Sequence, residues 1–407
     1  MVKYTTILLL FLGLLQCTAQ ESQTIAKAPN ASNTTANTAS IPAANNPESY
    51  LPKLQGKKIG LVANHTSIVE QDSRQHLVDF LLSHNIQITA IFAPEHGFRG
   101  TADAGEHIKD GKDAKTGIPL ISLYGNNKKP TPAQLKNIDI LLFDIQDVGA
   151  RFYTYISTLH YVMEAGAENN IPVIVLDRPN PNGHYIDGPV LEPAYKSFVG
   201  MHKVPIVYGM SIGEYAEMIN GEKWLKNQAQ AQLTVIPMRH YQRQEIYSLP
   251  VKPSPNLPND QSINLYPSLC FFEGTNVNEG RGTSWQFQVY GSPHLTNMPF
   301  SFTPQPNEGA KSPKHQGKKC HGEDLRNHPE LSSIDLQWLI KAYQNNTQKP
   351  FFTPTKNDFF FDKLAGNSKL RKQIEQGLSA EEIRATWQAD IEKFKKVRAK
   401  YLLYADF

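Results

Sequence analysis

Residues 138–155, with the sequence IDILLFDIQDVGARFYTY, join a largely apolar run to a polar segment and then to the start of a second apolar pattern. The run 138–143 predicts a buried strand. The apolar residues from Phe152 to Met163 recur at helical spacing and predict a helix with one inward face. A further apolar run at 171–176 predicts the next strand. A strand, a helix and a second buried strand indicate a parallel sheet that is covered on both faces.

The preceding residues repeat this alternation. Residues 58–63 and 88–93 are apolar and predict two more strands, and residues 74–84 predict a helix between them. We therefore expect an α/β fold with a Rossmann-like parallel-sheet subdomain, followed by a smaller α+β subdomain.

The composition changes near residue 195. Proline and glycine become frequent beyond this point and regular alternation stops, so we place the first subdomain at 48–195 and the second at 196–407. Near the end, Ser379 and Glu382 have the spacing of a capping box. They predict the start of one helix that carries four apolar residues on one side: Ile383, Trp387, Ile391 and Phe394.

The first residues predict export. Lys3 precedes a short apolar run at 7–15, which is typical of a signal peptide covering residues 1–19. Cys17 offers a second interpretation, because the preceding residues resemble a lipoprotein box and Cys17 would then carry the lipid. Residues 20–47 are small and polar and predict a flexible spacer. We expect a periplasmic protein, either free or anchored to the membrane through a lipid.

The overall composition excludes few classes of protein. The net charge of +3 gives no reason to expect nucleic acid as a partner, and the hydrophobic fraction of 40% is ordinary for a globular chain. Cys270 and Cys320 remain after processing and could pair, but Cys270 lies in an apolar stretch and is expected to pack in the core.

Polar side chains follow all four predicted strands. The carboxyl ends of parallel strands meet at one edge of a sheet, where ligands bind, so we expect these residues to form one site. They are Asn64, His65, Glu95, His96, Arg99, Asp144, Gln146, Asp147, Arg151, Asp177, Arg178, Asn180 and Asn182.

Glu95 is the first candidate for a catalytic residue. It directly follows a strand, in a position where partial burial would keep its carboxyl protonated as a general acid. Pairing with Arg99 is the structural alternative. Asp144 and Asp147 are the candidates for a second carboxylate, although Asp144 could instead hold the loop and Asp147 could cap the next helix.

The segment 272–283 predicts a binding loop in the second subdomain. It follows an apolar stretch and contains glycines, carboxylates, amides and one arginine. An ordinary turn is the alternative. The candidate ligands in this loop are Glu273, Asn276, Glu279 and Arg281.

The sequence lacks several known cofactor and nucleophile motifs. It contains no phosphate-loop lysine motif, no dinucleotide fingerprint after the first strand, no His-Glu-x-x-His and no Gly-x-Ser-x-Gly. We therefore expect neither a cofactor nor a metal.

Several segments resemble the exo-β-N-acetylmuramidase (NamZ-like) family of exported peptidoglycan-recycling glycosidases. They are FAPEHGFRG at 92–100, FDIQDVGARFYTY at 143–155, LDRPNPNG at 176–183, PSPNLP at 253–258, FEGTN at 272–276 and GRGT at 280–283. The resemblance extends from about residue 50 to the C-terminus. It implies a two-part fold with the active site in the cleft between the subdomains.

The resemblance also implies an activity, which is the exo-acting release of N-acetylmuramic acid from the non-reducing end of peptidoglycan fragments. Glu95 occupies the position of the family's glutamate. We expect the substrate-binding residues to be Asn64, His65, His96, Arg99, Arg151, Tyr155, Asp177, Arg178, Asn180, Glu273, Asn276, Glu279 and Arg281. The lactyl carboxylate of the sugar is expected to meet an arginine, with Arg281 first and Arg151 second.

Two other functions remain open from the sequence. A metal-dependent deacetylase or amidase acting on cell-wall sugars would need a cluster of metal ligands. A non-catalytic muropeptide-binding lipoprotein would bind the same saccharides without turnover.

Overall fold

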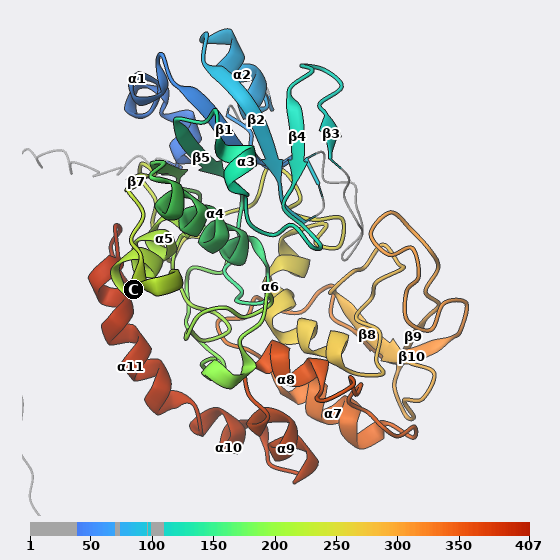
Figure 1. Cartoon of the computed structure of the whole chain (residues 1–407). Coiled ribbons are helices and arrows are strands. Elements are labelled where there is room, and N and C mark those ends of the chain that lie inside the picture. Colours follow the sequence, from blue (N-terminus) through green and yellow to red (C-terminus); the bar gives the residue numbers. More distant parts are fainter. Residues whose placement is uncertain (1–38, 70–73, 96, 99–109) are drawn as a thin grey trace, which may run out of the picture. The chain divides into compact units, whose positions relative to one another are not determined.

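The computed structural model describes residues 39–69, 74–95, 97–98 and 110–407. Residues 39–407 form one compact unit, shown in Figure 1. None of the helices in the described part of the chain is long and apolar enough to cross a membrane.

The main sheet has seven strands in the order β3-β4-β2-β1-β5-β6-β7. All neighbouring strands are parallel except β3 and β4. The strands are β1 (Lys58–Ala63), β2 (Gln87–Ala93), β3 (Gly111–Lys112), β4 (Pro119–Ser122), β5 (Ile140–Asp144), β6 (Val173–Leu176) and β7 (Leu233–Ile236). The parallel strands have the order of a doubly wound Rossmann sheet, whose direction reverses between β1 and β5. The predicted fold class is confirmed.

The sheet separates two apolar clusters, because alternate residues of a strand face opposite sides. In β5, Leu141 and Phe143 pack with the cluster that contains α4, whereas Ile140 and Leu142 pack with the cluster that contains α2. The helices of the first part are α1 (Leu51–Leu54), α2 (Leu77–Ser83), α3 (Pro132–Leu135), α4 (Tyr155–Asn169) and α5 (Ile212–Gly221).

The second half of the chain contains a small antiparallel sheet and six helices among its described elements. The strands are β8 (Val289–Ser292), β9 (Phe300–Phe302) and β10 (Cys320–Asp324), in the order β8-β10-β9. The helices are α6 (Asp260–Leu269), α7 (Gln337–Asn345), α8 (Phe360–Ala365), α9 (Lys369–Glu375), α10 (Ala380–Ala385) and α11 (Gln388–Arg398). In Figure 1 this small sheet and α6–α8 lie on the same side of the main sheet, below the ends of its strands.

Three sequence expectations differ from the fold. Residues 20–47 were expected to be a flexible spacer, but Ile41 pairs with Arg239 and Ala43 and Ala44 are fully buried, so the described end of this segment is part of the fold. β7 lies beyond residue 195, where we expected the first subdomain to end, yet it pairs with β6 in the main sheet. The single helix expected after Ser379 is divided into α10 and α11, with Trp387 at the start of α11. The predicted capping box of Ser379 and Glu382 is confirmed. Cys270 and Cys320 are both buried and unpaired, as free thiols.

Candidate active site

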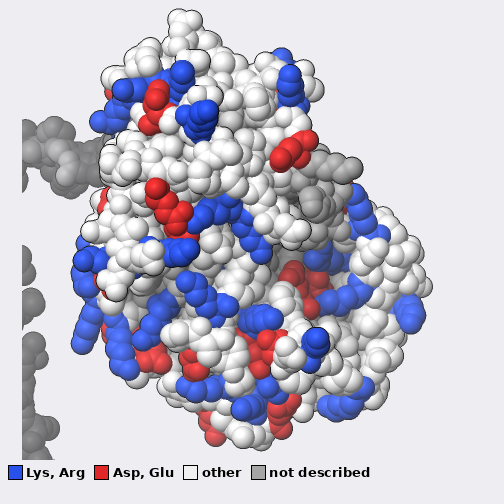
Figure 2. All heavy atoms as spheres, viewed as in Figure 1, with Lys and Arg blue, Asp and Glu red and all other residues white. Residues whose placement is uncertain are grey.

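A pocket of about 420 Å³ lies at the carboxyl end of the main sheet, between β2 and α4 on one side and the loops around α6 on the other. Figure 2 shows that this face of the molecule is hollowed, with both acidic and basic side chains around the hollow. The lining residues are Glu95, Tyr124, Lys128, Phe152, Tyr153, Thr154, Tyr155, Phe198, Val199, Ser254, Asn256, Leu257, Tyr266, Glu273, Arg281, Phe287 and Phe360.

Glu95 enters the pocket directly after β2. Its Oε2 accepts a 2.6 Å hydrogen bond from the hydroxyl of Thr154, which precedes α4. The Tyr155 hydroxyl donates to the Glu95 backbone carbonyl at 3.4 Å and accepts a 2.9 Å bond from the Asn64 amide. The start of α4 therefore holds both the side chain and the backbone of Glu95.

A second carboxyl group faces the pocket from the other half of the chain. Glu273 lies in the short 3₁₀ helix Cys270–Gly274 that follows α6. Its Oε1 lies 3.7 Å from Nη1 of Arg281, whose Nη2 donates to the Gly309 carbonyl at 3.1 Å. Arg281 thus holds Glu273 from a neighbouring loop while both side chains remain in the lining.

The electrostatic surroundings of Glu273 favour its protonated form. Burial raises the pKa of the Glu273 carboxyl to about 7, Arg281 opposes this rise, and the carboxylates of Glu279 and Glu95 add to it. The influence of Glu95 indicates that the two pocket carboxyls interact across the cavity. Two carboxyls that interact in this way resist ionising together, so one of them keeps a proton around neutral pH.

Aromatic rings make up much of the remaining wall. Tyr153 packs edge-on against Tyr155 and Tyr266, with ring centroids 4.8 and 6.0 Å apart, and Tyr266 packs against Phe287 at 4.9 Å. The Tyr153 hydroxyl donates to the Pro253 carbonyl at 2.8 Å. These contacts fix the rings, so they present a preformed apolar surface beside two carboxyl groups.

The predicted second carboxylates do not line the pocket. Asp144 is fully buried and makes a bidentate ion pair with Arg178, through contacts of 2.6 and 2.8 Å. Arg178 also donates to the Ile68 carbonyl. This corrects the expectation that Asp144 and Arg178 meet substrate, because each satisfies the other inside the fold.

Asp147 is likewise turned into the protein. Its Oδ2 accepts from the Gly149 amide at 2.7 Å and from the Tyr208 hydroxyl. Burial raises the pKa of the Asp147 carboxyl to about 6, and these hydrogen bonds oppose the rise. Gly149 has a φ of +73°, and a Cβ there would collide with the Asn180 side chain. Asp147 therefore shapes the tight turn before α4 instead of capping that helix.

Arg151 has a structural role, because it connects distant segments of the backbone. It is fully buried and donates to the carbonyls of Pro189, Val204 and Leu364 at 2.8, 2.7 and 3.0 Å. Burial without a carboxylate partner lowers the pKa of its guanidinium to about 9. Arg151 ties the segment before α4 to the second half of the chain and does not reach the pocket lining.

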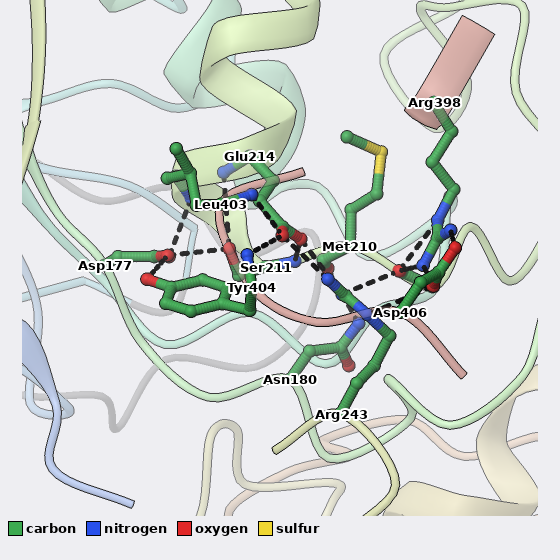
Figure 3. A network of polar contacts seen from close by, with 12 residues as sticks. Asp177, Asn180, Met210, Ser211, Glu214, Arg243, Arg398, Leu403, Tyr404 and Asp406 are labelled. Atoms are coloured by element: carbon green, nitrogen blue, oxygen red, sulfur yellow. Dashed lines mark hydrogen bonds and ion pairs between the residues drawn. The ribbon is translucent and has the colours of Figure 1, made fainter. Parts of the chain in front are cut away.

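Asp177 belongs to the buried network in Figure 3, which anchors the C-terminal tail. Its Oδ2 accepts from Ser211 and Tyr404, and Glu214 accepts from the tail amides of Leu403 and Tyr404. Arg243 pairs with Glu214 at 2.7 Å. The predicted substrate residue Asp177 is therefore part of the fold.

Seven other predicted ligands are not in the pocket lining or lie outside the described residues. Asn64 lies behind Tyr155, and Asn180 donates to the Met210 carbonyl. His65 contacts the Lys252 carbonyl, Asn276 donates to Gln348 and Pro350, and Glu279 accepts from Lys314. His96 and Arg99 lie outside the described residues.

The sequence prediction missed most of the pocket wall. Phe152, Tyr153 and Thr154 belong to the motif at 143–155, but Phe152 was assigned to the inward stripe of the following helix, and Tyr153 and Thr154 carried no separate signal. Lys128 and Phe198 follow irregular segments and carry no local signal. A group of three or more possible metal ligands is absent among the described residues.

Comparisons with known proteins agree along nearly the whole chain. The description "Exo-beta-N-acetylmuramidase NamZ, N-terminal" matches residues 59–261, and its C-terminal counterpart matches residues 264–404. The peptidoglycan beta-N-acetylmuramidase NamZ of Bacillus subtilis (strain 168) is 44% identical over 383 residues, covering 87% of this chain and 89% of that protein.

Two crystal structures of DUF1343 family proteins from Bacteroides fragilis NCTC 9343 have similar folds. The first has a TM-score of 0.83 and 47% identity, and covers 91% of this chain and 100% of its own. The second has a TM-score of 0.75 and 30% identity, and covers 90% and 99%. With both halves matched and the pocket drawing residues from each, the chain belongs to the exo-β-N-acetylmuramidase NamZ family.

Proposed function

We propose that this protein is an exo-acting glycoside hydrolase that releases N-acetylmuramic acid from the non-reducing end of peptidoglycan fragments. The observation that carries the proposal is the pair of pocket carboxyls, Glu95 and Glu273, in an aromatic-walled cavity at the ends of the sheet strands. The Bacillus subtilis relative is named for this activity. Neither alternative function is favoured by a feature of this pocket.

Glycosidic cleavage uses one protonated carboxyl and one carboxylate. We assign Glu95 as the general acid that protonates the departing oxygen. Glu273 replaces Asp144 and Asp147 as our candidate for the second group, which either activates water or attacks the sugar carbon. Arg281, at 3.7 Å, stabilises a negative charge on Glu273. Burial nevertheless raises the pKa of Glu273 to about 7, so the pair holds a proton near neutral pH that can serve as the acid.

The surrounding groups support this chemistry. The Thr154 hydroxyl can either donate to or accept from Glu95, so it can hold that carboxyl through both protonation states. The rings of Tyr153, Tyr155 and Tyr266 offer apolar faces for the carbon skeleton of a sugar. Ser254 and Asn256 add polar groups from the Pro-rich loop.

The test uses a defined N-acetylmuramyl disaccharide, with mass spectrometry to identify the released sugar. Wild type should release N-acetylmuramic acid, and Glu95→Gln and Glu273→Gln should each lose about 10²- to 10⁴-fold in rate. Absence of any release by the folded wild type would exclude the proposal. Intact disaccharide with a lost acetyl group would instead favour a deacetylase.

An aryl glycoside with a very good leaving group separates the two roles. Such a leaving group departs without protonation, so Glu95→Gln should recover most of its rate on this substrate. Glu273→Gln should remain slow on both substrates. The reverse pattern would exchange the two assignments and leave the glycosidase function intact.

We also propose export of the protein to the periplasm, in which it is either free or held by a lipid on Cys17. The support is the apolar run at 7–15 and the polar segment after it. Cell fractionation of the full chain and of Cys17→Ser distinguishes the two forms. A lipid-anchored protein should leave the membrane fraction when Cys17 is replaced, whereas a free protein should be in the soluble fraction in both cases.

A further inference from the structure

We propose that Lys128 forms an anion-binding subsite of the pocket, which recognises the carboxylate on the lactyl ether of N-acetylmuramic acid. This inference rests on the proposed function. Lys128 takes the role that the sequence suggested for Arg281 or Arg151. Arg151 is buried outside the lining, so the described pocket cations are Lys128 and Arg281.

The two cations differ in what already surrounds them. Arg281 has the Glu273 carboxylate at 3.7 Å and donates to the Gly309 carbonyl. Lys128 places its ammonium 4.3 Å from the centroid of the Phe198 ring. Among the described residues, no carboxylate lies at ion-pair distance from Lys128. Its charge is therefore available to a ligand, whereas the Arg281 guanidinium is already held by Glu273 and the Gly309 carbonyl.

The neighbouring residue Lys129 has carboxylate partners, so a lysine in this part of the chain is not without ion pairs merely because of its location. Lys129 pairs with Glu164 at 2.8 Å and with Glu168 at 2.7 Å, and both partners lie on α4. The chain thus fixes Lys129 to the helix and leaves Lys128 in the pocket lining. The ring of Phe198 orients the Lys128 ammonium through a cation–π contact without neutralising it.

The position of Lys128 relative to Glu95 suits one sugar unit. The Phe198 carbonyl accepts a 2.7 Å bond from Ser157 on α4. Ser157 lies three residues beyond Thr154, which holds Glu95, and this interval spans about 4.5 Å of helix axis. In N-acetylmuramic acid the lactyl ether is on C3, two ring positions from the glycosidic carbon C1, and its carboxylate extends outward from the ring. A sugar with its scissile bond at Glu95 can therefore direct its carboxylate toward Lys128.

The test compares one disaccharide with a derivative in which the lactyl carboxylate is converted to a carboxamide. The two differ only in that charge. Wild type should prefer the carboxylate by about ten- to a hundredfold in kcat/KM, which is the range for a hydrogen bond to a charged group. Lys128→Gln should lose this preference by slowing on the carboxylate while keeping its rate on the carboxamide. Lys128→Arg should retain most of the preference.

Two control variants establish whether Lys128 itself recognises the carboxylate. Lys136→Gln removes the same charge from an exposed position outside the lining and should leave the preference unchanged. Arg281→Lys should keep the preference if Lys128 is the recognising group. If Lys128→Gln keeps the full preference, the subsite is excluded while the muramidase function stands. If wild type cleaves neither disaccharide, the proposed function itself fails.

Discussion

The substitution Asp144→Asn separates a structural role of this carboxylate from the catalytic role that the sequence suggested. Asp144 is the last residue of β5 and meets Arg178 in a bidentate pair, with side-chain exposures of 0% and 3%. Asn keeps the size of the side chain but removes its charge and one of its two acceptors. The Arg178 cation would then remain in the interior without a counterion.

The expected cost follows from this burial. Removing one partner of a buried ion pair destabilises a protein by about 3–5 kcal/mol, because the remaining charge is uncompensated. For a unit the size of residues 39–407, unfolding entropy scales with length, so this loss corresponds to a decrease in Tm of about 4–6 °C. The rate per folded molecule should stay near that of wild type, since neither residue lines the pocket.

Thermal unfolding and urea titration measure the first effect, and kcat well below the transition temperature measures the second. The matched control replaces both partners, as Asp144→Leu with Arg178→Met. An apolar pair of similar volume can restore most of the stability that a single substitution removes. An Asp144→Asn protein with normal Tm and a rate reduced more than a hundredfold would refute the structural assignment and return Asp144 to the mechanism.

Four further outcomes are expected. Thr154→Val removes the 2.6 Å contact with Glu95 and should lower kcat about tenfold with little change in KM, whereas Thr154→Ser should restore the rate. Since the pair needs one proton and the pKa of Glu273 is raised to about 7, kcat/KM should fall as pH rises above about 7. Arg281 lowers that pKa, so Arg281→Gln should move this limb to higher pH; movement to lower pH would contradict the pairing. Dialysis against EDTA should leave activity unchanged, and loss with recovery upon adding zinc would overturn the metal-independent mechanism.

The sheet was predictable because its central strands are buried on both faces. β1 has the predicted bounds, and β2, β5 and β6 differ from prediction by at most two residues at either end. β4 and β7 were not predicted, because they are short and only partly buried. A strand at or near the sheet margin needs fewer apolar residues, so its local pattern resembles a loop.

The C-terminal helices show how a burial pattern can persist through a break. Ile383, Trp387, Ile391 and Phe394 are all buried, as one inward stripe predicts. The backbone nevertheless divides between Ala385 and Gln388. Spacing along the sequence reports which side chains face the core, but it does not report whether the hydrogen-bond ladder between them is continuous.

The polar residues at the strand ends were expected to form one site, and most of them hold the fold instead. Asp144, Asp147 and Asp177 each satisfy buried donors from other segments. The second half of the chain covers much of the sheet edge, and the loops buried there need acceptors for their amides and hydroxyls. Strand-end carboxylates supply these acceptors, so the same residue types serve both purposes.

Whether a strand-end carboxylate holds the fold or lines the active site depends on which segment covers that strand end. The covering segments lie far away in the sequence. The edge beside β6 is covered by the tail that carries Tyr404, which bonds to Asp177. The edge beside β2 faces the loop that carries Glu273, and the pocket remains there. Glu95 thus lines an open pocket, because the segment opposite it carries Glu273 and Arg281 and a cavity of about 420 Å³ remains between the two sides. The two carboxyls that glycosidic cleavage uses are therefore brought to one cavity by the same arrangement that keeps this end of the sheet open.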